Sequence, residues 1–373
     1  MKKLLLVTGK EYILRQNDGG RKCTYRNYEI LRQIYGEQNV YTYIFTNEYR
    51  ECDTQVIRGY ANGSLLQKVV NLFSGRLFYS YRQERELEKY IAEQHFDIVF
   101  FERSLFGSLI KKIKRLGVEV QIFMENIEMD YAKNKVIKQS FLYYLPYLVF
   151  KYNEKHSLRY CDRVICLTNR DADRLKELYG KKCDAIIPMT FQDRCEGWSV
   201  QAPCELKKEL LYIGSLFPPN YKGIKWFIDK VMPGLQDFRL YIVGKDFETK
   251  KKELESENVT VIGTVASLEE YYRTNRAIVM PIFYGDGIKI KTAEAIMYGK
   301  VIFATHEALE GYELKDIDGI TECNTADEFI EEIQRFYQEN TSSFSESVRC
   351  CFLEKYENNA AIELYNAQII NGT

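Results

Sequence analysis

Short apolar runs recur along the whole chain, and segments with a helical pattern separate them. Runs such as LLLVT, DIVFF, RVICLT and AIVMP are apolar at nearly every position. Strands of this kind are buried on both faces, which is typical of a parallel sheet between two layers of helices. Helices that connect parallel strands supply the right-handed crossovers of a doubly wound fold. The sequence therefore predicts an α/β protein with doubly wound parallel sheets.

The expected strands form two series, one in each half of the chain. The first comprises Lys3–Thr8, Val40–Thr46, Asp97–Glu102, Val118–Met124, Arg163–Thr168 and Asp184–Pro188, and the second comprises Glu209–Gly214, Phe238–Gly244, Val259–Gly263, Ala277–Pro281 and Lys300–Thr305. A chain of 373 residues is long for one core and suits two domains. Phe191–Lys208 has glycine, serine and proline without a sustained period, so it is expected to be the linker.

We therefore expect two Rossmann-like domains facing across a cleft, at residues 1–200 and 201–355. Residues 342–370 have a helical pattern. For the last part, 356–373, docking on the second domain and a return to the first both stay open.

Composition excludes several classes of protein. A net charge of −1 argues against a nucleic acid partner. Ten cysteines without a CxxC pair and three scattered histidines predict reduced thiols and no metal site. The first strand begins at Lys3 without a preceding signal sequence, and no apolar run approaches the roughly 18–20 residues of a membrane span. We expect a cytoplasmic protein without a bound cofactor.

The segment PIFYGDGIKIKTAEAIMYGKVIFAT begins at Pro281 and is the part of the sequence that most strongly indicates chemistry. A strand ends there, Gly285 and Gly287 follow, and a helix is expected from Ile288 to Tyr298, closed by Gly299. A glycine-flanked helix start at the carboxyl end of a parallel strand attracts anions through its free N–H groups and its dipole.

Four charged side chains lie near this helix start and add further binding groups. Lys289 and Lys291 bring positive charges. Glu294 lies seven residues beyond Gly287 on the same helix face, about 10 Å away, and can accept the two hydroxyls of a ribose. Asp286 can face a sugar on the other side of a diphosphate. A plain turn followed by an ordinary Lys–Glu surface pair remains the alternative interpretation.

This segment resembles the retaining family 4 glycosyltransferases of GT-B architecture, particularly those of bacterial polysaccharide assembly. The family has an acid, seven residues, then Glu-Ala before a glycine, and here Asp286, Glu294-Ala295 and Gly299 fit. The resemblance covers about residues 1–360 and is strongest after Leu211. It also includes YIGSLFPPNYKGIKWFIDKVMP, LYIVGKDF and VTVIGTVASLEEYY.

The resemblance implies a second domain that binds a nucleoside diphosphate sugar and a first domain on the acceptor side. Catalytic roles then fall to Asp286, Glu294, Lys222 and Glu125. The implied donor-binding residues are Gly19, Gly20, Gly214, Ser215, Gly244, Lys245, Gly263, Val265, Tyr284, Gly285, Gly287, Ile288, Lys289 and Lys291.

The sequence departs from the family at two positions. Ser215 stands where many members have an arginine on the diphosphate, although Lys222 is kept. Glu125 stands where members often have histidine, in Glu125-Asn126-Ile127-Glu128. Gly19 and Gly20 lie in a loop that fits neither the dinucleotide fingerprint nor the P-loop, and turn chemistry alone explains them equally well.

Leu65–Arg85 and Lys135–Lys155 combine aromatic, aliphatic and basic residues. Each suits either an anionic membrane surface at the inner face of the cell membrane or an aromatic core helix. Asp316-Ile317-Asp318 matches the D-x-D metal motif of another architecture, but a loop before Gly319 makes turn residues the expected interpretation.

The predicted function is transfer of a sugar, with retention, to a hydroxyl of a glycan or lipid-linked glycan in bacterial polysaccharide biosynthesis. Two alternatives stay open. One is a sugar-nucleotide epimerase on the same architecture, and the other is a catalytically degenerate paralogue that binds a partner protein, which Ser215 and Glu125 would suit.

Overall fold

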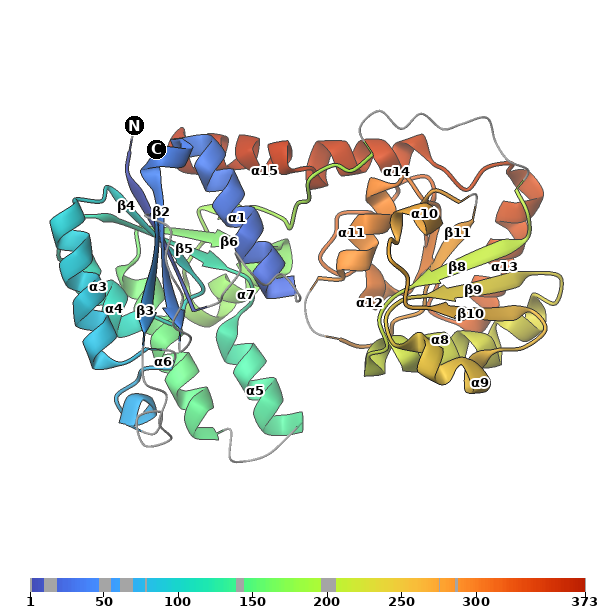
Figure 1. Ribbon diagram of the computed structural model, residues 1–373, viewed down its shortest axis with the longest axis horizontal. Helices are drawn as coiled ribbons and strands as arrows, with labels where there is room; N and C mark the ends of the chain where they lie inside the picture. The colour runs from blue at the N-terminus through green and yellow to red at the C-terminus, as the bar shows by residue number, and fades with distance from the viewer. Residues whose placement is uncertain are drawn as a thin grey trace. The chain divides into compact units, whose positions relative to one another are not determined.

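The computed structural model describes residues 2–9, 19–46, 55–60, 70–77, 79–138, 144–195, 206–274, 276–285 and 288–372. It divides into two compact units, Met1–Met189 with Ala361–Thr373, and Thr190–Ala360. Each unit has one parallel sheet between two layers of helices (Figure 1). The predicted fold of two Rossmann-like domains is confirmed.

The sheet of the first unit has seven strands in the order β3-β2-β1-β4-β5-β6-β7. Its strands are β1 (Leu4–Thr8), β2 (Val40–Thr46), β3 (Val56–Tyr60), β4 (Ile98–Glu102), β5 (Glu119–Met124), β6 (Arg163–Cys166) and β7 (Ala185–Ile186). Its helices are α1 (Gly19–Tyr35), α3 (Tyr81–Gln94), α4 (Gly107–Lys114), α5 (Glu128–Lys138), α6 (Tyr144–Tyr160) and α7 (Asn169–Tyr179).

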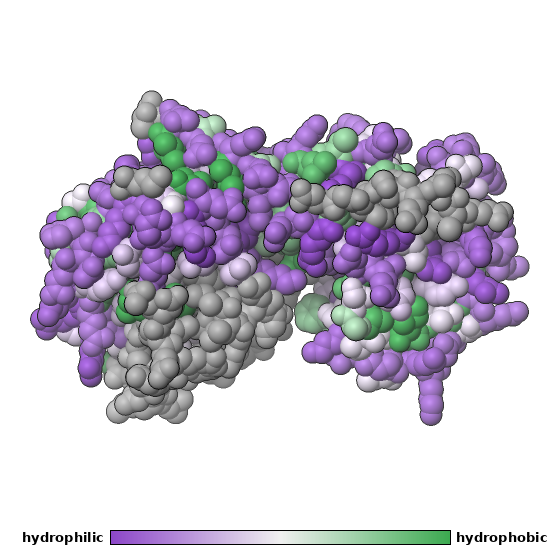
Figure 2. Space-filling model, turned by 45° about the horizontal axis from the view of Figure 1, so that its top comes forward, coloured by the Kyte–Doolittle hydropathy of each residue, from purple (hydrophilic) through white to green (hydrophobic). Residues whose placement is uncertain are grey.

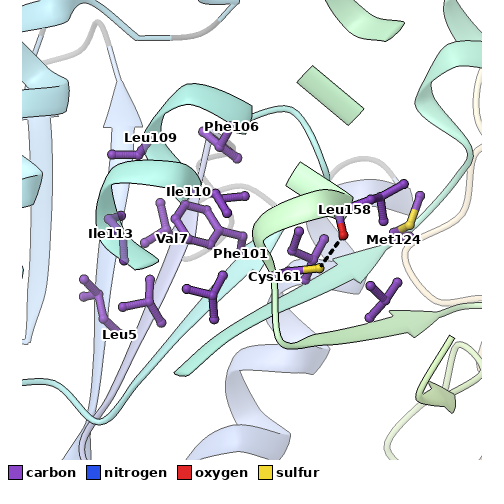
Figure 3. Close-up of a cluster of buried hydrophobic side chains, with 14 of the residues drawn as sticks. Leu5, Val7, Phe101, Phe106, Leu109, Ile110, Ile113, Met124, Leu158 and Cys161 are labelled. Carbon is purple, nitrogen blue, oxygen red and sulfur yellow. Dashed lines mark hydrogen bonds between the residues drawn. The ribbon is translucent and has the colours of Figure 1, made fainter. Parts of the chain in front are cut away.

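One face of this sheet carries an apolar core shared with α3, α4 and α6. Leu5, Val7 and Phe101 of the sheet meet Phe106, Leu109, Ile110 and Ile113 beside and on α4, while Leu158 and Cys161 at the end of α6 pack near Met124 (Figure 3). The helix α15 (Asn358–Tyr365) ends in this unit, where the Tyr365 hydroxyl lies 3.2 Å from that of Tyr35 and donates to Gln121 Oε1 at 2.5 Å. The last residues of the chain thus complete the first sheet's helical cover.

The sheet of the second unit has six strands in the order β10-β9-β8-β11-β12-β13. Its strands are β8 (Glu209–Ile213), β9 (Arg239–Val243), β10 (Val259–Gly263), β11 (Ala277–Met280), β12 (Ile302–Ala304) and β13 (Ile320–Glu322). Its main helices are α8 (Pro218–Lys230), α9 (Lys251–Leu254), α10 (Glu269–Tyr272), α11 (Ile290–Met297), α12 (His306–Leu309), α13 (Ala326–Glu339) and α14 (Glu346–Cys351). The π-helical turn η5 (Phe352–Tyr356) follows α14, and a second one, η6 (Asn366–Ile370), follows the last helix in the first unit.

Two edge strands were missing from the sequence prediction. β3 has the sequence VIRGY and β13 has ITE, and both pair with only one neighbouring strand. Edge strands are buried less than central ones, so they lack the continuous apolar run that marked the others. The residues of β13 are half-buried or exposed.

Most of the visible surface is hydrophilic, with smaller hydrophobic areas (Figure 2). Within the described ranges no helix is both long and apolar enough to cross a membrane.

Candidate functional site

The candidate site of the second unit lies where its sheet changes direction. From β8 the chain moves to β9 and β10 on one side, and then returns to β11 on the other side of β8. Loops that leave the carboxyl ends of β8 and β11 therefore run in opposite directions, and open α/β sheets bind ligands in the crevice between such loops. The segment Pro281–Gly285 and α11 follow β11 at this point.

Three of the predicted glycines meet at the carboxyl ends of β8, β9 and β10. The Gly244 N–H donates to the Gly263 carbonyl at 2.8 Å, and the Gly214 N–H donates to the Val243 carbonyl at 3.0 Å. Gly244 has a φ of 145°, and a Cβ there would lie 1.9 Å from the Gly214 carbonyl oxygen. No side chain fits at Gly244, so the backbones at this edge lie close together.

Lys291 extends from α11 to the end of β8. Its Nζ donates to Asn220 Oδ1 at 2.8 Å and to the Tyr212 hydroxyl at 3.2 Å. A Cβ at Gly214 would come within 2.9 Å of this ammonium, so glycine leaves room for it. Burial, and secondarily the charge of Lys289, lower the pKa of Lys291 to about 7, against the opposing effect of Glu294. An anion bound beside Gly214 would restore the full charge.

The other two predicted lysines are arranged differently. Lys289 forms an ion pair of 2.6 Å with Glu307, close to Gly285. Lys222 on α8 is exposed, its Nζ is 5.5 Å from the centre of the Tyr284 ring, and it makes no ion pair with any residue of the described ranges. Lys222 therefore keeps its charge available to a ligand, whereas Lys289 is partly neutralised by Glu307.

Glu294 is held by aromatic side chains. Its Oε2 accepts a hydrogen bond of 3.3 Å from the Tyr272 hydroxyl, and its Oε1 lies 4.0 Å from Arg194. The Tyr272 ring is buried and stacks on Tyr298, with ring centres 4.9 Å apart and parallel planes. The Glu294 side chain is 16% exposed, so it stays accessible to a ligand while its direction is constrained.

The remaining predicted residues of this unit surround the same edge. Ser215 and Lys245 are exposed, and the Ser215 carbonyl accepts a hydrogen bond of 2.9 Å from Asn220 Nδ2. Val265 and Ile288 are half-buried. Asp286 and Gly287 lie outside the described residues, and their predicted roles stay predictions.

The residues predicted in the first unit lie at the carboxyl end of its own sheet. Gly19 and Gly20 open α1, and Thr24 of the next turn donates to the Gly20 carbonyl at 3.1 Å. Glu125 directly follows β5 and is buried. Beside it, Glu102 ends β4 and accepts a hydrogen bond of 2.7 Å from Asn27.

A buried polar network supports the loop that contains Glu125. Arg103, which has a positive φ of 84°, donates two hydrogen bonds to the Glu128 carboxylate, one from Nε and one from Nη2. Glu154 of α6 accepts from the backbone N–H of Glu128 at 2.6 Å and from the Tyr179 hydroxyl at 2.6 Å. Burial raises the pKa of Glu154 to about 7 in spite of these donors. The carboxylate therefore caps the start of α5 and holds the Glu125 loop in place.

Sequence reasoning missed several of the contacting residues. Asn220, Tyr212, Tyr272 and Glu307 place the predicted lysines and Glu294, yet none was predicted. Asn220 lies in the N-x-x-G stretch of the resemblance, which was the available signal. The others became visible only through contacts across the sheet.

No group of three or more His, Cys, Asp or Glu side chains in the described part of the chain could hold a metal ion. Asp316 has a φ of 63°, and the Asp318 carbonyl accepts a hydrogen bond from Ser345, so these two acids belong to a tight turn before β13.

Comparison with known proteins gives a family for the second unit. Residues 207–339 match the family model of the group 1 glycosyl transferases. An uncharacterized 44.6 kDa protein in the cps region of Klebsiella pneumoniae is 24% identical over 236 residues. That match covers 58% of this chain and 59% of the relative, so it spans about three fifths of the relative's length.

Solved structures match the whole chain. The lipopolysaccharide outer core galactosyltransferase WaaB has a TM-score of 0.66 at 13% identity, with both chains covered completely. HepE of Anabaena in complex with UDP has a TM-score of 0.65 at 11% identity, again over both complete chains. Sucrose-phosphate synthase of Thermosynechococcus elongatus has a TM-score of 0.66 at 15% identity and the same complete coverage. Residues 207–339 therefore match the group 1 glycosyl transferases, and the chain as a whole has the GT-B fold of two Rossmann-like domains.

Proposed function

We propose that this protein transfers a sugar from a nucleoside diphosphate donor to a hydroxyl of a glycan or lipid-linked glycan, with retention of configuration, during assembly of a bacterial polysaccharide. The observation that carries the proposal is the meeting of the end of β8, at Gly214, with α11, which is distant in sequence and carries both Lys291 and Glu294. Related proteins support it, because HepE of Anabaena was solved with UDP-glucose and the Klebsiella relative lies in a cps region.

The residues suit the charges of such a reaction. The diphosphate would lie beside Gly214 and the Lys291 ammonium, with Lys222 as a further cation of the same unit. Glu294 would accept the ribose hydroxyls. When the bond between the anomeric carbon and the diphosphate oxygen breaks, these cations stabilise the leaving group, so no metal is required. The acceptor oxygen forms the new bond to that carbon, and a phosphate oxygen of the leaving group takes the acceptor proton.

The first unit would bind the acceptor. Its sheet ends in buried carboxylates, Glu102 and Glu125, rather than in lysines. Carboxylates accept hydrogen bonds from sugar hydroxyls and repel phosphates. A lipid-linked acceptor would place the protein in the cytoplasm, peripherally on the inner face of the cell membrane.

Ligand binding by variants of the full chain tests the proposal. A calorimetric screen with UDP, GDP and ADP finds the preferred nucleotide, and Lys291→Ala is expected to weaken its binding by about tenfold to a hundredfold. Lys225→Ala is the matched control, because Lys225 lies on the same unit and pairs only with Asp229 on the surface of α8. Equal affinity of the Lys291→Ala variant and the wild type would exclude the surroundings of Gly214 and Lys291 as the diphosphate site.

Product analysis separates the alternatives. A transferase releases nucleoside diphosphate in step with glycosylated acceptor, and the product keeps the donor's anomeric configuration. An epimerase changes the sugar with no acceptor present. A degenerate, partner-binding paralogue turns over no donor sugar with any acceptor, and Glu125 and Ser215 remain the positions that favour it.

A further inference from the structure

The exposed face of α6 in the first unit is unusually apolar. Its inner face packs through Val149, Asn153, Ser157 and Leu158, which are buried. Its first half also presents Tyr144, Leu145, Leu148 and Tyr152 to solvent, with exposed fractions of 45%, 37%, 42% and 46%. A helix with one buried face normally has polar residues opposite it, so this apolar outer face needs a further explanation.

A short helical turn extends the apolar area beside α6. Residues 70–73 form this turn, where Val70 is 51% and Phe73 is 74% exposed. Asn153 Nδ2 of α6 donates to the Gly75 carbonyl at 2.8 Å, and the Tyr152 ring approaches Gly75 closely. The segment after the turn is therefore held against α6, and both elements have exposed apolar side chains. We call the six exposed side chains Val70, Phe73, Tyr144, Leu145, Leu148 and Tyr152 the apolar patch.

The helices that carry and flank the patch are basic. α4 and α6 together have six lysines and arginines, Lys111, Lys112, Lys114, Lys151, Lys155 and Arg159. Their only acidic residue is Glu154, which is completely buried. Lys112 pairs with Glu84 and Lys114 with Asp162, while Lys151 and Lys155 have no ion pair among the residues that the structure describes. The exposed charge of these two helices is therefore entirely positive.

The geometry points to an anionic lipid surface as the partner of this face, and we propose that the apolar patch inserts among the lipids while Lys151 and Lys155 contact the headgroups. Tyrosines suit the boundary between headgroups and acyl chains because one end of the ring is apolar and the other is polar. Each lysine near such a surface adds attraction that salt weakens. The alternative partner is a protein with an acidic surface, and the experiment distinguishes it from a lipid surface.

The place of this face on the first unit agrees with the proposal. The first half of α6 extends beyond the carboxyl ends of the strands of its own sheet, as does α5 (Figure 1). Glu102 and Glu125 lie at that same end. Provided that the proposed transfer reaction holds, a lipid-linked acceptor would present its sugar next to the membrane that the patch contacts.

Vesicle flotation with the full chain tests this inference without donor or acceptor, so its result is independent of catalysis. The wild type is expected to float with vesicles of phosphatidylcholine and phosphatidylglycerol, to float less at high salt, and to stay unbound with phosphatidylcholine alone. The double variants Phe73→Ser with Leu148→Ser, and Lys151→Glu with Lys155→Glu, are expected to bind at least about tenfold more weakly.

Matched controls come from the second unit. Leu353→Ser changes an exposed leucine, and Lys230→Glu with Lys252→Glu reverses two exposed lysines, and both variants should float like the wild type. Thermal unfolding and nucleotide binding verify that every variant is folded. The inference would be overturned if the wild type did not bind anionic vesicles, or if the patch variants bound them as well as the wild type does. An acidic protein partner would then be the explanation of the basic face.

Discussion

The two units have similar parallel sheets, but the carboxyl ends of their strands differ in chemistry. In the second unit three glycines bring the backbones together, and Lys291 reaches the space that they leave. In the first unit β4 ends in the buried carboxylate Glu102, and the buried carboxylate Glu125 directly follows β5. We therefore propose that the same architecture serves as an anion site in one unit and as a hydroxyl-accepting site in the other, because the residues after each strand, and not the sheet, select the ligand.

The largest expected effect tests the close backbone contact of the second unit. Gly244→Ala should lower the free energy of unfolding of that unit by about 3 kcal/mol, since its Cβ would overlap the Gly214 carbonyl. Trp226 lies on α8 of this unit, so urea unfolding followed by tryptophan fluorescence measures it.

Gly117→Ala in the first unit is the control for that change. Gly117 also has a positive φ, of 81°, but no atom lies within 4 Å of the added Cβ. Its substitution should cost only about 1 kcal/mol, measured by circular dichroism. Equal losses at Gly244 and Gly117 would mean that the close contact does not matter.

Stability should depend on pH with opposite signs in the two units. The pKa of Glu154 is about 7 in the folded first unit against a usual 4.5, so the folded state holds more protons than the unfolded state between these values. Stability of this unit should fall as the pH rises from about 5 to about 7, by up to about 1.4 kcal/mol per pH unit. Glu154→Gln should remove that slope.

In the second unit burial lowers the pKa of Lys291 and of Lys300 to about 7 from 10.5. The unfolded state then holds more protons between pH 7 and about 10, so stability should rise with pH through that range. Tryptophan fluorescence reports this unit, and circular dichroism reports both. A second unit that loses stability over this range would contradict the assigned burial of these lysines.

Nucleotide binding should show the protonation of Lys291 directly. A bound diphosphate favours the charged lysine, so the complex takes up a proton above pH 7 and affinity should fall there by up to about tenfold per pH unit. Lys291→Arg should remove this slope because arginine stays charged. Lys222→Arg should keep it, and calorimetry over a pH series measures all three proteins.

The smallest expected effect concerns the support of Glu294. Tyr272→Phe removes the 3.3 Å hydrogen bond to its carboxylate and should weaken nucleotide binding by about threefold to fivefold. Tyr241→Phe is the control, since that hydroxyl also donates to a carboxylate at 3.3 Å, on Glu209 at the opposite, amino end of the sheet. Similar losses in the two variants would show that Tyr272 has only a structural role.

The sequence by itself determined the two sheets, and it named many of the residues that lie together around β8 and α11 in the second unit. Buried central strands need apolar residues on both faces, so β1, β4, β8 and β11 are visible in the chain without any contact being known. The start of α11 and its end before Gly299 follow from local backbone preferences in the same way. The glycines and lysines around α11 could be predicted because their residue type and their position next to a strand end are visible in the local sequence.

Only the tertiary structure decided how those residues work together. Asn220 and Tyr212 hold Lys291 from 71 and 79 positions away, and no periodicity connects them. The same holds for Tyr272 beneath Glu294, and for the network of Arg103, Glu128 and Glu154. The edge strands β3 and β13 also depend on their neighbours rather than on their own sequence. Contacts across a sheet join residues that are distant in the chain, and the pKa of Lys291 and of Glu154 follows from that burial, which local sequence does not specify.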